Sequence, residues 1–314
     1  MRKYIIARLC QLVPVLFGIT LLTFGLMQLA ADDAVDVFYA RSGAVSEEVK
    51  AARRAELGLD RPLYEQYFGW LGGVLRGDMG KSYISGKDVT GLFAEKLPAT
   101  VSLMLASLAL TMAFAVPCGI AAAVKQGGMA DWLIRFLSFV GNSLPNFFVA
   151  LLLLYFIALK LRLLPVMPSE GDWRGVLLPA LTLAVSMGAK YVRQVRTAVL
   201  EELSKPYVEG ARARGVSETR ILFGSVLRSA MVPLLTLLAI SMGSLLGGTA
   251  IVETIFLWDG VGRLAIDAVL TRDYPLIQVY IIWMSFIYVG INLLADLGYY
   301  YLDPRTREKG RGAA

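Results

Sequence analysis

The sequence predicts an all-α polytopic membrane protein of six transmembrane helices, with a helical extracytoplasmic insertion after the first helix. The first observation is composition: the 314 residues are 56% hydrophobic and only 18% charged, and the mean hydropathy is +0.60. A soluble chain of this size needs far more charge on its surface. The second observation is that the apolar residues form long runs, each near the roughly 20 residues that cross a bilayer.

The predicted spans follow one another with polar segments between them. Proline removes a helical hydrogen bond and clashes with the preceding turn, so kinks are expected at Pro14, Pro117, Pro145 and Pro179. The spans cover, approximately, residues 9–30, 100–124, 136–160, 176–200, 230–254 and 278–302.

The first run, which follows Arg2 and Lys3, also has features of a signal peptide. A signal peptide has an apolar core of only ~7–15 residues, whereas this run extends from Leu9 to Ala30. We interpret it as a retained first span. Cleavage near Ala30 is the alternative.

The basic residues predict the orientation of the chain. With the N-terminus inside, most Lys and Arg of the short loops fall on the cytoplasmic side, the largest group between residues 190 and 228. Such a bias marks cytoplasmic loops, so both termini are predicted to be cytoplasmic. The net charge of +6 then reports topology and does not indicate nucleic acid as a partner.

These spans divide the chain into an N-terminal helix (1–30), an insertion (31–99), a core (100–302) and a tail (303–314). In the insertion, Ser46 is expected to open a helix that Gly58 ends. Aromatic residues follow it. The insertion packs on itself and on the ends of the spans, or it receives a soluble partner, and both readings stay open. The aromatic cluster consists of Tyr64, Tyr67, Phe68 and Trp70.

Several kinds of site are excluded. The chain has no His, which excludes a histidine metal site and a His-based triad, and no metal site is predicted. The segment from Leu75 to Ser82 nearly matches a phosphate-binding loop, but Leu75 replaces the first Gly, no strand precedes it, and the predicted topology puts it outside the cell. We expect Gly77, Gly80 and Ser82 to form a turn instead, and no cofactor bound by this chain.

A basic loop at residues 201–229 separates the fourth and fifth spans. Ser204 is expected to cap a short helix that has Pro206 in its first turn and ends at Gly215. Ser217 then begins a second helix with an apolar face. Such a loop docks onto another protein or lies on lipid headgroups. The apolar face of the second helix carries Ile221, Leu222, Val226 and Leu227.

The first of these helices resembles the "EAA" loop of ABC-importer permeases, in which Glu-Ala-Ala, three residues and Gly form a coupling helix. Glu209, Gly210, Ala211 and Gly215 fall on that motif; Gly210 departs from it and weakens the helix by up to ~1 kcal/mol relative to Ala. The resemblance covers nearly the whole chain and is closest to permeases for peptides and nickel. Further matches are Arg8, Glu56–Pro62, Gly77–Gly80, Leu97–Thr100, Ser143–Phe147, Glu253–Phe256, Gly260–Arg263, Arg272–Pro275 and Asp303–Arg305, while Asp32–Ala34 departs from the family's Gly-Asp-Pro.

The resemblance implies the fold of a type I ABC-importer permease in the bacterial inner membrane. It also implies a second homologous permease subunit in a heterodimer, two cytoplasmic ATPase subunits that hold ATP and Mg, and an extracytoplasmic binding protein. This chain would be a non-catalytic membrane subunit. Glu209, Gly210, Ala211, Arg212 and Gly215 would couple the ATPases to the spans.

The fifth span and the segment after it supply the other candidate residues. Small and polar Ser241, Ser244 and Gly248 are expected to approach the translocation path, although helix packing alone would also favour small residues. Glu253, Asp259 and Arg263 would form an outer gate or a rim on which the binding protein docks; a solvated salt-bridged loop is the alternative.

The substrate is read from two features of the sequence. The loop at 160–176 is short, and Leu97–Thr100 resembles nickel-type permeases, so nickel or a nickel chelate is favoured, with di- or oligopeptides as the alternative. A secondary transporter or channel working without ATP is the competing class of protein. A membrane-embedded enzyme is disfavoured because no paired acids or metal ligands have suitable spacing.

Overall fold

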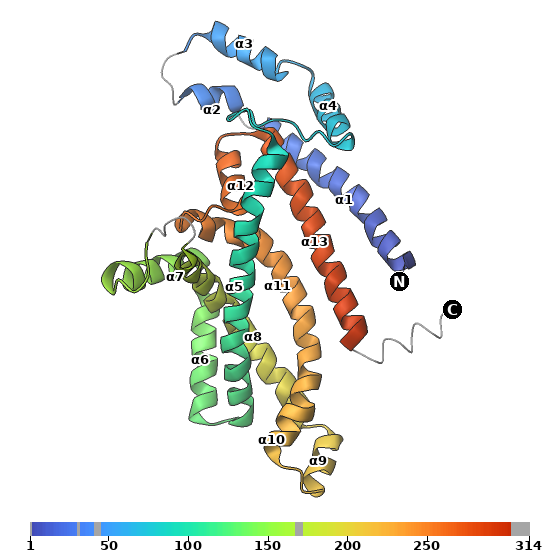
Figure 1. Ribbon diagram of the computed structural model, residues 1–314, viewed down its shortest axis with the longest axis vertical. Coiled ribbons are helices and arrows are strands. Elements are labelled where there is room, and N and C mark those ends of the chain that lie inside the picture. The colour runs from blue at the N-terminus through green and yellow to red at the C-terminus, as the bar shows by residue number, and fades with distance from the viewer. Residues whose placement is uncertain (1, 30–31, 41–44, 167–171, 303–314) are drawn as a thin grey trace. The chain divides into compact units, whose positions relative to one another are not determined.

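The computed structural model describes residues 2–29, 32–40, 45–166 and 172–302. These residues form helices and an isolated antiparallel bridge between Lys81 and Asp88 (Figure 1). The predicted tail 303–314, with Asp303–Arg305, lies outside this part, as do the side chain of Arg8 and the position of Ala30. The prediction of an all-α polytopic chain is confirmed.

In the described residues, four helices are continuous, long and apolar enough to cross a membrane, and counting each of two bent pairs as one span gives up to six. Met129–Ser143 and Asn146–Lys160 meet at 105°, and Glu218–Met231 and Thr236–Gly243 meet at 45°. The predicted span 136–160 is therefore part of a broken helix pair that begins at Met129. Pro145 lies at the sharper break, where a proline kink was expected. The continuous candidates are Cys10–Gln28, Val89–Val124, Trp173–Leu203 and Tyr274–Leu294.

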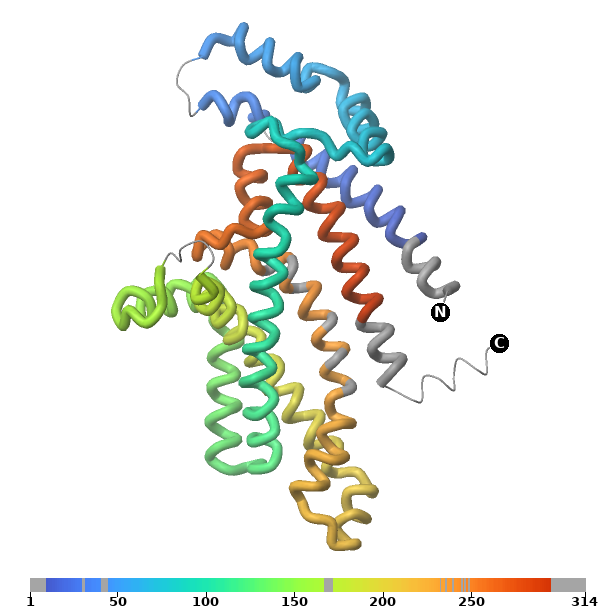
Figure 2. The backbone as a smooth tube through the Cα atoms, viewed as in Figure 1, coloured from blue at the N-terminus to red at the C-terminus, as the bar shows by residue number. Residues whose placement is uncertain are grey.

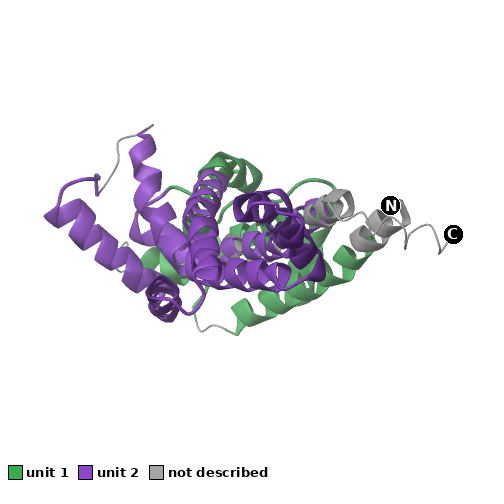
Figure 3. Ribbon diagram, turned by 90° about the horizontal axis from the view of Figure 1, so that it is seen from below, with its two compact units in different colours: residues 1–100, 259–289 green, residues 101–258, 290–314 purple. Residues whose placement is uncertain are grey.

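The chain forms two compact units, coloured separately in Figure 3. Unit 1 contains residues 1–100 and 259–289, and unit 2 contains residues 101–258 and 290–314. The helices α5 and α13 each contribute residues to both units. Figure 2 traces the backbone through the chain in order of residue number. Unit 1 holds α1 (Arg2–Gln28), α2 (Ala34–Ala40), α3 (Glu47–Leu57), α4 (Leu63–Leu75), α12 (Val261–Leu270), the start of α5 (Val89–Val124) and most of α13 (Tyr274–Leu302).

In unit 1 the predicted insertion packs on itself and on helix ends. Gly58 ends α3 in the left-handed conformation at φ 69°, as expected. Arg54 of α3 binds Asp33 and Asp36 at 2.6 and 2.7 Å, which ties α3 to α2. Tyr67 of α4 packs on α1.

The turn expected around Gly77 and Gly80 is present, since both have φ near +85°. The segment after it is tied to the turn between α12 and α13. Buried Asp273 accepts hydrogen bonds from the Ser82 hydroxyl and the Tyr83 backbone N–H. Burial raises the pKa of Tyr83 to about 12, so its phenol stays neutral.

Unit 2 holds the remainder of α5 and the helices that lead into the basic loop. Its core is a cluster of small and branched apolar side chains on α5, α8, α9 and α11. The elements are α6 (Met129–Ser143), α7 (Asn146–Leu153), the π-helix η1 (Leu154–Lys160), the 3₁₀ helix η2 (Trp173–Val176), α8 (Leu177–Leu203), α9 (Pro206–Ala213), α10 (Glu218–Ile221), the π-helix η3 (Leu222–Val226) and α11 (Leu227–Ile255).

Candidate coupling site

The first helix of the basic loop is α9, and proline and glycine set its ends. Pro206 occupies the first helical position, where its missing N–H does no harm, and Lys205 is the N-cap. The prediction that Ser204 caps this helix is wrong: Ser204 still belongs to the end of α8, and its hydroxyl donates to the Glu201 carbonyl at 2.8 Å.

Gly215 ends the helix as predicted. Its φ of +77° is a left-handed conformation that other residues rarely adopt. The N–H of Val216 bonds the Ala211 carbonyl at 3.2 Å, and the N–H of Gly215 bonds the Arg212 carbonyl at 2.9 Å. These two hydrogen bonds satisfy backbone carbonyls that the end of the helix would otherwise leave without a donor.

Val208 anchors α9 to the rest of unit 2. Its side chain is 0% exposed and lies in the core cluster with Val195 and Val199 of α8 and Ile221 of α10. Ala211 packs against the edge of the same cluster. Because one side of this short helix is fixed in the core, a displacement of α9 has to move its neighbours or break their contacts.

The second helix of the loop differs from the prediction. After Ser217, α10 forms only Glu218–Ile221 and passes through η3 directly into α11. The predicted apolar face is nevertheless turned inward, because Ile221 and Val226 are buried and Leu222 packs beside them. The loop therefore contains one separate helix, α9, followed by the beginning of the next span.

The exposed face of α9 carries charge. Glu209 and Arg212 are exposed, and Gly210 is half-buried, where an added Cβ would make an ordinary contact of 3.9 Å with Nη1 of Arg214. Arg212 binds Glu218 through two hydrogen bonds of 2.7 and 3.1 Å, which raises the pKa of the Arg212 guanidinium. At the N-terminal end of α9, the Tyr207 hydroxyl donates a hydrogen bond of 3.0 Å to the Glu202 carboxylate. Burial, and secondly this carboxylate, raise the pKa of Tyr207.

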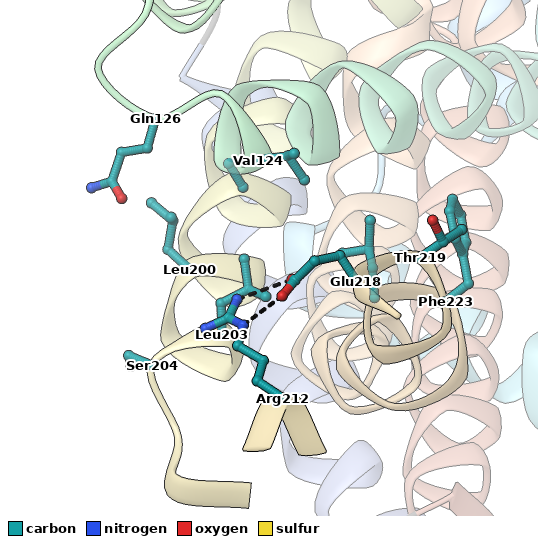
Figure 4. A pocket seen from close by; sticks show the side chains of 11 residues that line it. Val124, Gln126, Leu200, Leu203, Ser204, Arg212, Glu218, Thr219 and Phe223 are labelled. Carbon is teal, nitrogen blue, oxygen red and sulfur yellow. Dashed lines mark hydrogen bonds and ion pairs between the residues drawn. The ribbon is translucent and has the colours of Figure 1, made fainter. Parts of the chain in front are cut away.

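A cavity of about 500 Å³ lies between the ends of α5 and α8 and the loop. Figure 4 shows that the Arg212 and Glu218 side chains point toward one another across it, joined by their two hydrogen bonds. Apolar side chains also line the cavity, including Val124, Leu200 and Phe223. The five residues predicted to form the coupling helix thus come together on one helix and its C-terminal turn.

The predicted path residues lie on α11. Ser241 is half-buried. Ser244 and Gly248 belong to the same helix, but their side-chain surroundings lie outside the described part of the structure.

The residues predicted to form an outer gate or docking rim belong to two units, Glu253 to unit 2 and Asp259 and Arg263 to unit 1. Glu253 of unit 2 is 0% exposed, so in this conformation its side chain does not face a soluble partner, and its role in an outer gate stays a prediction. Asp259 is exposed and pairs with Lys96, and Arg263 lies 3.9 Å from Asp267. Both of these pairs belong to unit 1.

One buried ion pair near the loop was not predicted. Asp131, 1% exposed at the start of α6, accepts two hydrogen bonds of 2.8 Å from Arg196 of α8 and one of 3.0 Å from the Gly127 N–H. In the sequence, Arg196 is one of the basic residues between 190 and 228 that predict the orientation of the chain. An acid at the first turn of an apolar helix, opposite a basic segment, is the signal in the sequence that indicates such a pair.

Comparison with known families supports a transport role. Residues 115–308 match the model described as "Binding-protein-dependent transport system inner membrane component", and residues 1–104 match its N-terminal companion. Among solved structures, the inward-facing MetNI methionine ABC transporter is similar with a TM-score of 0.60 at 15% identity, over 68% of this chain and 97% of that one. That likeness supports the fold.

Three curated relatives align with 98% of this chain over their full length. They are a probable peptide ABC transporter permease of Sinorhizobium fredii (37% identical), the di/tripeptide permease DppB of Pseudomonas aeruginosa (34%) and the glutathione permease GsiC of Escherichia coli (35%). The expected nickel substrate finds no support among these relatives, which favour the peptide alternative.

Proposed function

Because this chain belongs to the family of inner-membrane components of binding-protein-dependent transport systems, we propose that it forms half of the path through which an ABC importer takes up small peptides. The observation that carries the peptide assignment is the full-length similarity to permeases named for peptides, a di/tripeptide and glutathione. Glutathione is itself a small peptide, so all three names indicate one class of substrate.

We infer that α9 receives the movement of the ATPase subunits. It is a short helix with an exposed charged face bearing Glu209 and Arg212, and an opposite face fixed in the core by Val208. A partner that moves the exposed face would displace α8 and α11, which share that core. The half-buried Gly210 and Ala211 leave room for close approach of another backbone.

The proposed assembly contains this chain, a second homologous permease, two ATPase subunits that bind ATP and Mg, and an external binding protein. Both termini and α9 would face the cytoplasm, which alkylation of single cysteines by an impermeant reagent would test from each side. Ser241, Ser244 and Gly248 are proposed to line the path. Asp259 and Arg263 are proposed as contacts of the binding protein.

The substrate is tested with the complete importer reconstituted in proteoliposomes, with its binding protein outside. We expect ATP-dependent uptake of labelled di- and tripeptides, competed by unlabelled glutathione. Nickel or a nickel chelate at the same concentration should neither be taken up nor stimulate ATP hydrolysis. Nickel-only stimulation would overturn the peptide assignment, and uptake without ATP would favour a secondary transporter.

A further inference from the structure

The helix α4 packs against the side of a membrane span. The Tyr67 hydroxyl lies 3.0 Å from the Thr20 hydroxyl of α1, and the Tyr67 ring packs on Phe17 and Phe24. All of these residues belong to unit 1. The candidate span of α1 is Cys10–Gln28, so these contacts are made within the span.

The position of these contacts along α1 gives the depth of α4. Phe24 and Phe17 lie four and eleven residues before Gln28. At 1.5 Å per residue, this places the contacts about 6 to 16 Å along the helix from its end, and somewhat less along the membrane normal if the helix is tilted. This range covers the boundary between headgroups and acyl chains, where interfacial helices bury their apolar face ~5–10 Å deep. Figure 1 shows α4 beside the end of α1 opposite the N-terminus.

The surface of α4 has three faces. Tyr67, buried, marks the face against α1. A second face carries Glu65, Gly69 and Gly72. The third is an apolar stripe at i, i+4, i+7 and i+11. This stripe, the α4 stripe, consists of Tyr64, Phe68, Leu71 and Leu75, of which Tyr64, Phe68 and Leu75 are 64%, 59% and 81% exposed.

The composition of α4 fits lipid better than water. Glu65 is its only charged residue, and three of its side chains are Tyr or Trp, which gather at membrane interfaces. The span against which α4 packs also exposes apolar side chains, among them Val13, Leu22 and Leu26. The α4 stripe therefore lies on a helix that is held against an apolar membrane span.

We propose that α4 is an interfacial helix whose stripe inserts into the leaflet at which α1 ends, and that it anchors the insertion to the lipid surface. This inference rests on the membrane location of the family and is independent of the substrate. It replaces the reading of residues 31–99 as a cap wholly outside the membrane.

The test uses spin labels on the complete importer in nanodiscs of phosphatidylcholine and phosphatidylglycerol. With Cys10 and Cys118 replaced by Ala, one cysteine is introduced as Phe68→Cys or Leu71→Cys. Glu48→Cys, on exposed α3 of the same insertion, is the matched control. Relaxation of each label is measured with oxygen, which concentrates in lipid, and with chromium oxalate, which stays in water.

We expect both α4 labels to relax more with oxygen than with chromium oxalate, by several-fold relative to the ratio at the Glu48→Cys label. A ratio equal to that control would place the stripe in water and overturn the proposal. Low collision with both agents would mean that a protein partner covers the stripe, which also overturns it. Two label positions keep the test decisive if one variant does not assemble, and neither readout depends on which substrate is transported.

Discussion

A methyl group added at Gly119 should loosen the support of α9. A Cβ built at Gly119 of α5 would lie 2.6 Å from the Val195 Cβ, 2.7 Å from its Cγ1 and 2.9 Å from the Val192 carbonyl oxygen. Carbon atoms normally approach to about 3.5–4.0 Å, so α5 and α8 would have to separate by roughly 1 Å. Val195 is in the core cluster that holds Val208, so the shift reaches the coupling helix.

The expected cost of Gly119→Ala follows from two opposing effects. Overpacking a core costs about 1–3 kcal/mol. Replacing Gly by Ala inside a helix recovers up to about 1 kcal/mol. The net loss of unfolding free energy is therefore ~0–3 kcal/mol against the unchanged chain and about 1–3 kcal/mol against a helical Gly→Ala replacement that meets no neighbour. It appears as a lower melting temperature of the purified importer together with weaker coupling of ATP hydrolysis to uptake.

Gly188→Ala in α8 is the matched control, because a Cβ there meets no atom within 4 Å. It should leave the melting temperature unchanged or raise it. Adding Val195→Ala to Gly119→Ala removes Cγ1 but leaves Cβ, so it should relieve only part of the crowding, visible as a double-mutant loss smaller than the sum. Equal melting temperatures for the Gly119→Ala and Gly188→Ala variants would refute the reasoning.

Three further predictions concern other elements. Gly215→Ala should lower the free energy of unfolding by ~1–2 kcal/mol, because the left-handed conformation strains any Cβ, whereas Gly210→Ala should leave it unchanged or raise it. Thermal unfolding and ATPase assays compare the two variants, and equal effects would contradict the role of Gly215 as the helix cap. Tyr67→Phe should cost ~0.5–1.5 kcal/mol through the lost hydroxyl bond to α1, seen as faster amide exchange in α4; unchanged exchange would count against it. Asp36 is partly desolvated, which raises its pKa, but the hydrogen bond and charge of Arg54 lower the pKa overall. The α2–α3 contact should therefore hold above pH ~4 and weaken as the pH falls through the lowered pKa. Limited proteolysis measures this weakening, and Asp36→Asn should abolish its dependence on pH.

The apolar runs predicted most of the fold because span length depends on local composition. Glycine and proline were equally informative: Gly58 and Gly215 end helices in the left-handed conformation, and Pro145 marks the break after α6. These features depend on the geometry of a single residue. They need no knowledge of neighbours in space.

The features that were missed depend on contacts between distant parts of the chain. The helix α5 begins at Val89, ahead of the predicted span, and includes Lys96, which interrupts the apolar run and is paired with Asp259. Ser204 looked like a cap but is already used by α8. The Asp131–Arg196 pair joins residues far apart in sequence, so the acid at the start of α6 signals that a partner exists but does not identify it as Arg196.

The wide turn η3, between the basic loop and α11, has a consequence for how rotation is transmitted. An α-helix turns by about 100° per residue, and a π turn takes in one additional residue, so it resets the angular phase of everything beyond it. If the π turn, now at Leu222–Val226, shifted along the helix by rearranging a few hydrogen bonds, the side chains that it passed would point to a different face. In that case a displacement of the basic loop would rotate the span about its own axis without bending that axis.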